Sequence, residues 1–221
     1  ALCTELSALP FDVSYIANKD NVGFGKANNQ AIKQAKGEFT LIINPDTLVS
    51  EDTFSTLISH MRSNPECGAA GCKILNPDGS FAPESKRSVP TIWAALTKLL
   101  GLHTLFPKSR LFGQYYLSWL TEDQQAQVPV LSGSFMFWRT DLLQQLGGFD
   151  ERFFMYGEDI DLCYRVQDTS YHIDYVPSTS IIHYKGESTK KGDLRYIRIF
   201  NWRAHLLIGA KPRHASFYSP R

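Results

Sequence analysis

The 221 residues include 23 Lys and Arg against 22 Asp and Glu, and 43% of them are hydrophobic. Such a chain buries a substantial core, and its net charge of +1 gives no electrostatic basis for nucleic acid as the main partner. No apolar stretch approaches the roughly 20 residues that cross a bilayer, so we expect a soluble or peripheral protein. The four cysteines form no zinc or disulfide pattern and fit a reducing, cytoplasmic compartment (Cys3, Cys67, Cys72 and Cys163).

The first third of the chain predicts an α/β arrangement. Residues 11–17 alternate in polarity and residues 39–43 form a short apolar run, which predicts two β-strands. Between them Ala27, Ala31 and Ala35 recur every fourth residue, as on one face of a helix. A strand, a helix and a strand within about 30 residues predict a βαβ unit with parallel strands.

The middle of the chain predicts a further helix and strand, followed by an insertion. Residues 53–63 follow Asp52 as a helix, and residues 69–75 read as a strand closed by a turn. Residues 84–128 have polar edges and an amphipathic centre, which predicts a helical insertion. We expect its apolar side chains to pack on the core; the alternative is a flap or membrane-facing helix.

The last third resumes the alternation of strands and helices. Residues 128–138 predict a buried strand with a break of small residues, and residues 141–146 predict a helix. Two short strands are predicted over 171–176 and 180–184. A basic and aromatic helix over 194–213 fits either docking on the protein or contact with an anionic membrane surface.

An acidic stretch, FMYGEDIDLCYR (154–165), contains the first candidate catalytic residues. If a helix begins at Glu158, Asp161 and Arg165 lie four residues apart and can pair. Glu158 and Asp159 then lie in the first turn, where the helix dipole stabilises carboxylates. Helix capping explains one of these two acids, and a general base is the alternative explanation for the other.

A second candidate site follows the strand predicted over 39–43. Asp46 comes directly after it, and ligands of open α/β sheets bind beyond the carboxyl ends of strands. An ordinary turn is the alternative. A hard divalent cation accepts such a carboxylate, and His183 could add a nitrogen acceptable to Mn²⁺. Lys185 and Ser188 could then hold a diphosphate.

The segment NVGFGKANN (21–29) matches a dinucleotide-binding fingerprint only in part. Gly23 and Gly25 agree with it, but Asn28 occupies the position of the third glycine. The chain has no P-loop motif either. The sequence therefore does not predict a Rossmann-type cofactor.

Three stretches together resemble one known family. NVGFGKANNQAIKQAKGEFTLIINPDT (21–47), VLSGSFMFWRTDLLQQLGGFDERFFMYGEDIDLCYRV (130–166) and IIHYKGEST (181–189) resemble the inverting family-two glycosyltransferases, particularly the rhamnosyltransferase-like branch. The resemblance implies an α/β protein of the GT-A fold, with a mostly parallel sheet flanked by helices. Because the family begins with a nucleotide-binding strand and helix, we expect that N-terminal strands are missing here. The implied domains are a catalytic domain over 1–193 and a C-terminal helix and tail over 194–221.

The resemblance also implies roles for individual residues. Asp46 would bind Mg²⁺ or Mn²⁺ on the donor diphosphate, although Asn44 replaces the first acid of the usual motif, and His183 would be a further ligand. Asp159 matches the catalytic base, and Glu158 would orient the acceptor or the helix turn. The residues implied to line the donor site are Asn28, Asn29, Gly133 and Ser134.

The implied activity is transfer of a sugar, such as rhamnose, from a UDP- or dTDP-linked donor. The acceptor would be a glycan or a polyprenyl-diphosphate-linked sugar used for cell-surface polysaccharide, which places the enzyme in the cytoplasm or at the inner face of the membrane. One alternative is a non-catalytic sugar-nucleotide-binding module with the same fold. A nucleotidyltransferase would need a Gly-rich N-terminal loop, and a two-carboxylate glycosidase would need a defined carboxylate separation that nothing here indicates.

Overall fold

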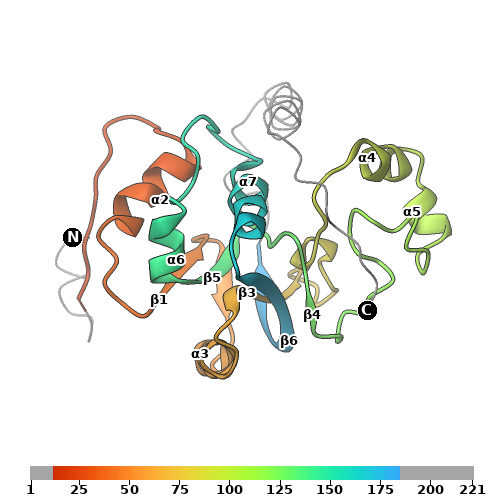
Figure 1. The fold of residues 1–221 in the computed structure, drawn as a ribbon, viewed down its shortest axis with the longest axis horizontal. Coiled ribbons are helices and arrows are strands. Elements are labelled where there is room, and N and C mark those ends of the chain that lie inside the picture. Colours follow the sequence, from red (N-terminus) through yellow and green to blue (C-terminus); the bar gives the residue numbers. More distant parts are fainter. Residues whose placement is uncertain (1–11, 185–221) are drawn as a thin grey trace.

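A mixed six-stranded sheet forms the centre of the molecule (Figure 1). The computed structural model describes residues 12–184. The strands are β1 (Phe39–Ile43), β2 (Thr47–Val49), β3 (Cys67–Leu75), β4 (Ala126–Gln127), β5 (Phe135–Arg139) and β6 (His172–His183). Their order is β1-β5-β3-β6-β2, and β4 pairs with β6 beside that path.

The pairing differs from the mostly parallel sheet that we expected. Within residues 12–184, β3 and β6 pair in parallel, whereas β1 and β3 each pair antiparallel to β5, and β2 and β4 each pair antiparallel to β6. Strands β1, β3 and β6 therefore run in one direction. Their carboxyl ends meet the start of β5 at a single edge of the sheet, which we call the carboxyl edge.

Helices cover both faces of the sheet. They are α2 (Phe24–Ile32), α3 (Thr53–Ser63), α4 (Ile92–Leu99), α5 (Leu102–Leu105), α6 (Thr140–Gln145) and α7 (Glu158–Arg165), with short 3₁₀ turns at Pro83–Ser85 and Val166–Asp168. In Figure 1, α2, α6 and α7 lie on one face and α3 on the other, while α4 and α5 lie to one side of the sheet.

Strand β5 links the two layers of the core. Met136 and Trp138 pack with α6 and α7 in one cluster, and Phe135 and Phe137 pack with α3 in the other. Successive side chains of a strand point to opposite faces, so a strand covered on both sides needs apolar residues at every position. This explains the continuous apolar run FMFW and its prediction as a buried strand.

Two sequence predictions about strands were wrong. Residues 12–17 are exposed and form no strand, so the predicted βαβ unit is not formed, although α2 is; β-rich composition alone does not make a strand without a paired neighbour. The two strands predicted over 171–176 and 180–184 are a single strand, β6. Its pairing with β3 shifts register between Val176 and Ser180, and Pro177 lies in this irregularity because it has no N–H for the ladder.

The packing predicted for the insertion is wrong for its helical centre, although Leu117, later in the insertion, is buried in the core. Its centre is helical as predicted, but α4 buries only its small side chains, Ala94 and Thr97. Ile92 and Leu99 are 84% and 83% exposed. The helix thus turns its large apolar side chains away from the core.

Candidate active site

The carboxyl edge brings together residues that are far apart in the sequence. The backbone N–H of Asn44 donates to the carbonyl of Ser134 at 3.0 Å, and the N–H of Tyr184 donates to the carbonyl of Asp46 at 2.9 Å. The Asn-Pro-Asp turn after β1 is therefore attached to both the Ser-Gly-Ser segment before β5 and the end of β6. Four of the predicted site residues lie on these three segments: Asp46, Gly133, Ser134 and His183.

Asp46 and His183 form a close pair with unused polar atoms. Asp46 Oδ1 lies 3.2 Å from His183 Nε2, and both side chains are nearly buried. Within residues 12–184, Asp46 Oδ1 and His183 Nδ1 nevertheless have no hydrogen-bond partner. Two ligands of one octahedral ion with bonds of about 2.1 Å lie roughly 3 Å apart. The carboxylate and the imidazole therefore fit a divalent cation, Mn²⁺ more readily than Mg²⁺ because of the nitrogen.

Asp159 is held in the first turn of α7 by three hydrogen bonds. Its Oδ2 accepts from the Arg87 guanidinium at 2.5 Å and from the Gly133 N–H at 3.2 Å, and its Oδ1 accepts from the Ile160 N–H at 2.8 Å. A carboxylate offers about four lone-pair sites, so one remains for a further donor. Together the three bonds fix the orientation of the carboxylate, as a general base requires.

Glu158 lies beside Asp159 in a different environment. The residue is 6% exposed, and its Oε2 has no hydrogen-bond partner. Burial, together with the negative charge of Asp159, raises the pKa of Glu158 to about 8. At neutral pH Glu158 is therefore mainly a neutral acid.

Arg87 is a site residue that the sequence did not predict. It comes from the start of the insertion, where its backbone N–H donates to the carbonyl of Val130 at 3.1 Å. Its guanidinium donates to the carbonyl of Leu131 at 2.8 Å as well as to Asp159. Arg87 and Asp159 are 72 residues apart. No local pattern could reveal this contact, because only the fold brings the two segments together.

A protein-family model described as glycosyltransferase like family 2 matches residues 2–199. The chain belongs to glycosyltransferase family 2. This confirms the family that the three sequence stretches indicated.

Relatives of this glycosyltransferase domain include two rhamnosyltransferases. N-acetylglucosaminyl-diphospho-decaprenol L-rhamnosyltransferase of Mycobacterium tuberculosis is 29% identical over 209 residues, covering 90% of this chain and 66% of that protein. Rhamnosyltransferase WbbL of Escherichia coli is 28% identical, covering 81% of this chain and 66% of that protein. The chain thus spans just under two thirds of the length of these relatives.

Solved structures share the fold of the glycosyltransferase domain. TarS of S. aureus in complex with UDP-GlcNAc superposes with a TM-score of 0.56 and 17% identity, over 97% of this chain and 55% of that one. Mannosyltransferase PcManGT from Pyrobaculum calidifontis, in complex with GDP-Man and Mn²⁺, superposes with a TM-score of 0.53 and 18% identity. The match covers 88% of this chain and 45% of that one. These similarities confirm the predicted GT-A fold.

The asparagines predicted near the nucleotide have structural partners in this domain. Asn29 is buried, donates to the carbonyl of Phe149 at 2.8 Å and accepts from the Phe149 N–H at 2.8 Å. Asn28 donates to the carbonyl of Phe24 at 2.9 Å. Gly23 has a φ of +87°, and a Cβ there would lie 2.5 Å from the carbonyl oxygen of Phe154. The motif around these residues thus attaches α2 to the loop before α7.

Other predicted residues of the domain have mixed outcomes. The predicted ion pair within α7 is confirmed, with Arg165 Nε 2.9 Å from Asp161 Oδ2. Lys185, Ser188 and the C-terminal helix over 194–213 lie outside the described residues.

A second group of potential metal ligands lies at the opposite edge of the sheet. His60, Cys67 and Asp174 place one ligand atom each within 4.8 Å of one another. His60 Nε2 is hydrogen-bonded to Asp174 Oδ2 at 2.8 Å, and the Cys67 thiol donates to the carbonyl of Ala69 at 3.2 Å. Burial, with the nearby charge of Asp174, raises the pKa of Cys67, which disfavours the thiolate that binds metals.

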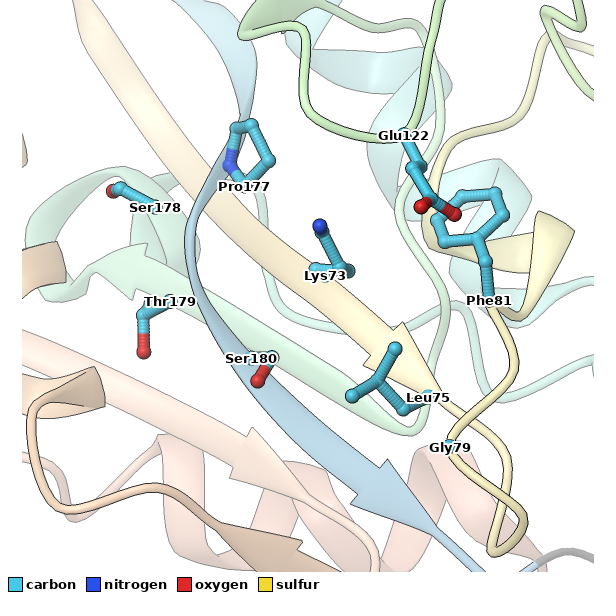
Figure 2. A pocket seen from close by; sticks show the side chains of 9 residues that line it. All are labelled: Lys73, Leu75, Gly79, Phe81, Glu122, Pro177, Ser178, Thr179 and Ser180. Atoms are coloured by element: carbon cyan, nitrogen blue, oxygen red, sulfur yellow. The ribbon is translucent and has the colours of Figure 1, made fainter.

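A cavity of about 310 Å³ lies beside the end of β3 and the middle of β6, at the register shift (Figure 2). Figure 2 shows the Lys73 amino group between Pro177 and Glu122. That amino group is already paired with Asp123. None of the predicted site residues lines the cavity, so it is not part of the candidate active site.

Proposed function

We propose that this domain is an inverting glycosyltransferase that moves a sugar, such as rhamnose, from a nucleotide-diphosphate donor to a hydroxyl of its acceptor. The observation that supports this most directly is the carboxyl edge. There an oriented carboxylate, Asp159, and the close pair of Asp46 Oδ1 and His183 Nε2 are connected through the Ser-Gly-Ser segment.

In the proposed reaction Asp159 acts as the base. Its remaining lone pair accepts the proton of the acceptor hydroxyl while that oxygen attacks the anomeric carbon and the bond to the diphosphate breaks. Arg87 and the Gly133 N–H keep the carboxylate oriented. Glu158, largely protonated, can donate a hydrogen bond to the acceptor or to the helix turn.

Asp46 and His183 would hold Mg²⁺ or Mn²⁺, and the position of Asp46 Oδ1 3.2 Å from His183 Nε2 supports this assignment. Such an ion would neutralise the charge that develops on the leaving diphosphate. Gly133 and Ser134 would line the sugar pocket. Lys185 and Ser188 would add a cation and a hydroxyl for the diphosphate. Asn28 and Asn29 would act near the nucleotide by holding the loop before α7 in place.

The names of the relatives support a donor and an acceptor class. A lipid-linked acceptor of the polyprenyl-diphosphate type, or a glycan built on one, fits the decaprenol-dependent relative. We assign a UDP- or dTDP-linked sugar as donor and cell-surface polysaccharide synthesis as the role, at the inner face of the membrane. Residues 1–193 would form the catalytic domain, and residues 194–221 a C-terminal helix and tail.

Calorimetric titration with UDP, dTDP and GDP, each with and without Mn²⁺, tests the proposal. We expect Mn²⁺-dependent binding of one nucleotide, lost in Asp46→Ala and retained in Asp78→Ala, which alters an exposed turn. Absence of binding would overturn the proposal. Binding without sugar transfer to any lipid-linked acceptor would favour the non-catalytic module.

A further inference from the structure

The insertion exposes an unusual amount of apolar surface. Eight large apolar side chains between residues 92 and 111 are at least 40% exposed: Ile92, Trp93, Leu96, Leu99, Leu100, Leu105, Phe106 and Leu111. We call them the insertion surface. Single exposed apolar residues are ordinary, but a concentration of this kind marks an interaction site.

Contacts within the insertion join these side chains into one surface. The ring of Phe112 lies 6.2 Å from that of Trp93 and 5.3 Å from that of Phe106. Trp93 Nε1 also donates to the carbonyl of Leu111 at 2.8 Å. On α4, residues 92, 96 and 99 follow the helical repeat and share one face. The loop and both helices therefore present their apolar groups together.

The charge of this segment is of one sign. No Asp or Glu occurs between Glu84 and Glu122, whereas five Lys and Arg do. Lys108 and Arg110 are exposed beside the insertion surface. Lys98 lies over the ring of Tyr115 at 3.9 Å. Apolar side chains bordered by basic ones are typical of segments that lie in the interface of an anionic bilayer.

The positive charge of the insertion argues against two other partners for the insertion surface. Residues 185–221 contain nine Lys and Arg against two Asp and Glu, so covering the insertion with this segment would bring positive charge against positive charge. A second copy of the chain would meet the same repulsion. A surface of negative lipid headgroups is complementary to the insertion in both charge and polarity.

The insertion is firmly attached next to the base. The amino group of Lys86 donates to the carbonyls of Leu117 and Leu120 at 3.2 and 2.9 Å, which closes the segment on itself. The next residue, Arg87, is paired with Asp159. When the insertion surface rests on a bilayer, the insertion therefore connects that bilayer directly, through Arg87, to Asp159 in the candidate active site.

We propose that the insertion surface docks the protein on an anionic lipid bilayer and so holds Asp159 near the membrane, where a lipid-linked acceptor lies. The functional part of this inference rests on the proposed function. The docking itself does not, because vesicles without acceptor or nucleotide test it separately.

Cosedimentation of the full chain with vesicles measures the docking. We expect binding to mixed phosphatidylcholine and phosphatidylglycerol vesicles and weak binding to phosphatidylcholine alone. Ile92→Glu combined with Leu99→Glu should lower the partition coefficient for vesicles at least about tenfold, because two highly exposed apolar side chains are lost. Lys108→Glu combined with Arg110→Glu should remove the preference for anionic lipid. Phe54→Glu, at an exposed apolar position of α3, is the matched control and should bind as the wild type does.

Quenching of tryptophan fluorescence by brominated lipid locates the contact. Trp93 is 40% exposed on the insertion surface, whereas Trp138 is fully buried. We expect quenching that Trp93→Phe abolishes. Quenching that survives Trp93→Phe but is lost in Trp202→Phe would overturn the proposal in favour of the C-terminal segment. Failure of the full chain to bind vesicles would also overturn it. So would a full chain that dimerises without binding vesicles, if Ile92→Glu combined with Leu99→Glu abolishes the dimer.

Discussion

The two edges of the sheet each hold a histidine beside an aspartate, yet the two pairs differ in how their polar atoms are used. At the carboxyl edge, Asp46 Oδ1 lies 3.2 Å from His183 Nε2, but within residues 12–184 neither Asp46 Oδ1 nor His183 Nδ1 has a hydrogen-bond partner. At the opposite edge, Asp174 Oδ2 is hydrogen-bonded to His60 at 2.8 Å. A buried polar atom without a partner costs free energy unless a ligand satisfies it.

This contrast separates the proposed metal site from a structural pair that uses the same residue types. His60 belongs to α3 and Asp174 to β6, so their hydrogen bond attaches a helix to the sheet. Asp46 instead lies in the turn after β1 and His183 at the end of β6, and that turn is hydrogen-bonded to the Ser-Gly-Ser segment, which also binds Asp159.

The largest expected effect concerns the base at the carboxyl edge. Asp159→Asn should lower the rate of sugar transfer by about 10³-fold, because the amide cannot accept the acceptor proton. Nucleotide binding should persist. The matched control is Asp168→Asn, at an exposed carboxylate just beyond α7, which should keep the wild-type rate. A rate for Asp159→Asn within tenfold of the wild type would show that another group is the base.

The second prediction compares the two histidines directly. His183→Ala should weaken Mn²⁺ binding at least about tenfold, measured by titration, with little change in stability. His60→Ala should leave Mn²⁺ binding unchanged and lower the free energy of unfolding by about 1–3 kcal/mol, because Asp174 loses its partner. The opposite outcome would move the metal site to the His60, Cys67 and Asp174 group.

The third prediction concerns the pH dependence due to Glu158. Its pKa of about 8 in the folded protein lies above the ordinary value of 4.5, so its contribution to stability is fully present below about pH 4.5 and is lost as the pH rises through about 8. Glu158→Gln should therefore be more stable than the wild type at pH 9, on the order of 1–4 kcal/mol, and similar to it at low pH. Urea unfolding across this range measures the difference.

The same substitution also tests which acid is the base. Because Gln resembles the protonated Glu158 in shape and neutrality, Glu158→Gln should keep sugar transfer within about tenfold of the wild type at pH 7. A loss as large as that of Asp159→Asn would assign the proton transfer to Glu158.

The smallest expected effect concerns Asp174, at the opposite edge of the sheet. Its contribution to stability is lost as the pH falls, whereas that of Glu158 is lost as the pH rises. Burial alone would raise the pKa of Asp174, but the hydrogen bond from His60 and the charge of His172 hold it below its ordinary value of 3.8. This contribution to stability is present above about pH 4 and is lost as the pH falls through the lowered pKa. The wild type should be more stable than Asp174→Asn at pH 6, and the difference should shrink toward pH 3. A constant difference would show that the pair does not act through its charge.

Much of the fold could be predicted from local patterns. The apolar repeat of 53–63 and the acidic start of 158–165 predicted α3 and α7, and the run FMFW predicted the central strand β5. The Asn-Pro-Asp turn and His183 were predicted to share a site, and they lie 3.2 Å apart at their closest polar atoms. These features depend on helix and strand periodicity or on short motifs, which are properties of neighbouring residues.

The direction of strand pairing could not be predicted in the same way. The pattern of β5 is equally compatible with parallel and antiparallel neighbours, since both bury alternate side chains on the two faces. The exposure of the apolar face of α4 was not predicted either. An amphipathic repeat shows that a helix has an apolar face but not what that face contacts.

The sequence by itself determined the family, the bounds of α3 and the residue types of the candidate site. Only the tertiary structure decided that Arg87 pairs with Asp159, that Asn29 bonds to backbone, and that Asp174 is hydrogen-bonded to His60. The physical reason is the same in each case: hydrogen bonds between segments as far as 120 residues apart depend on how the layers pack, and no local periodicity records that packing.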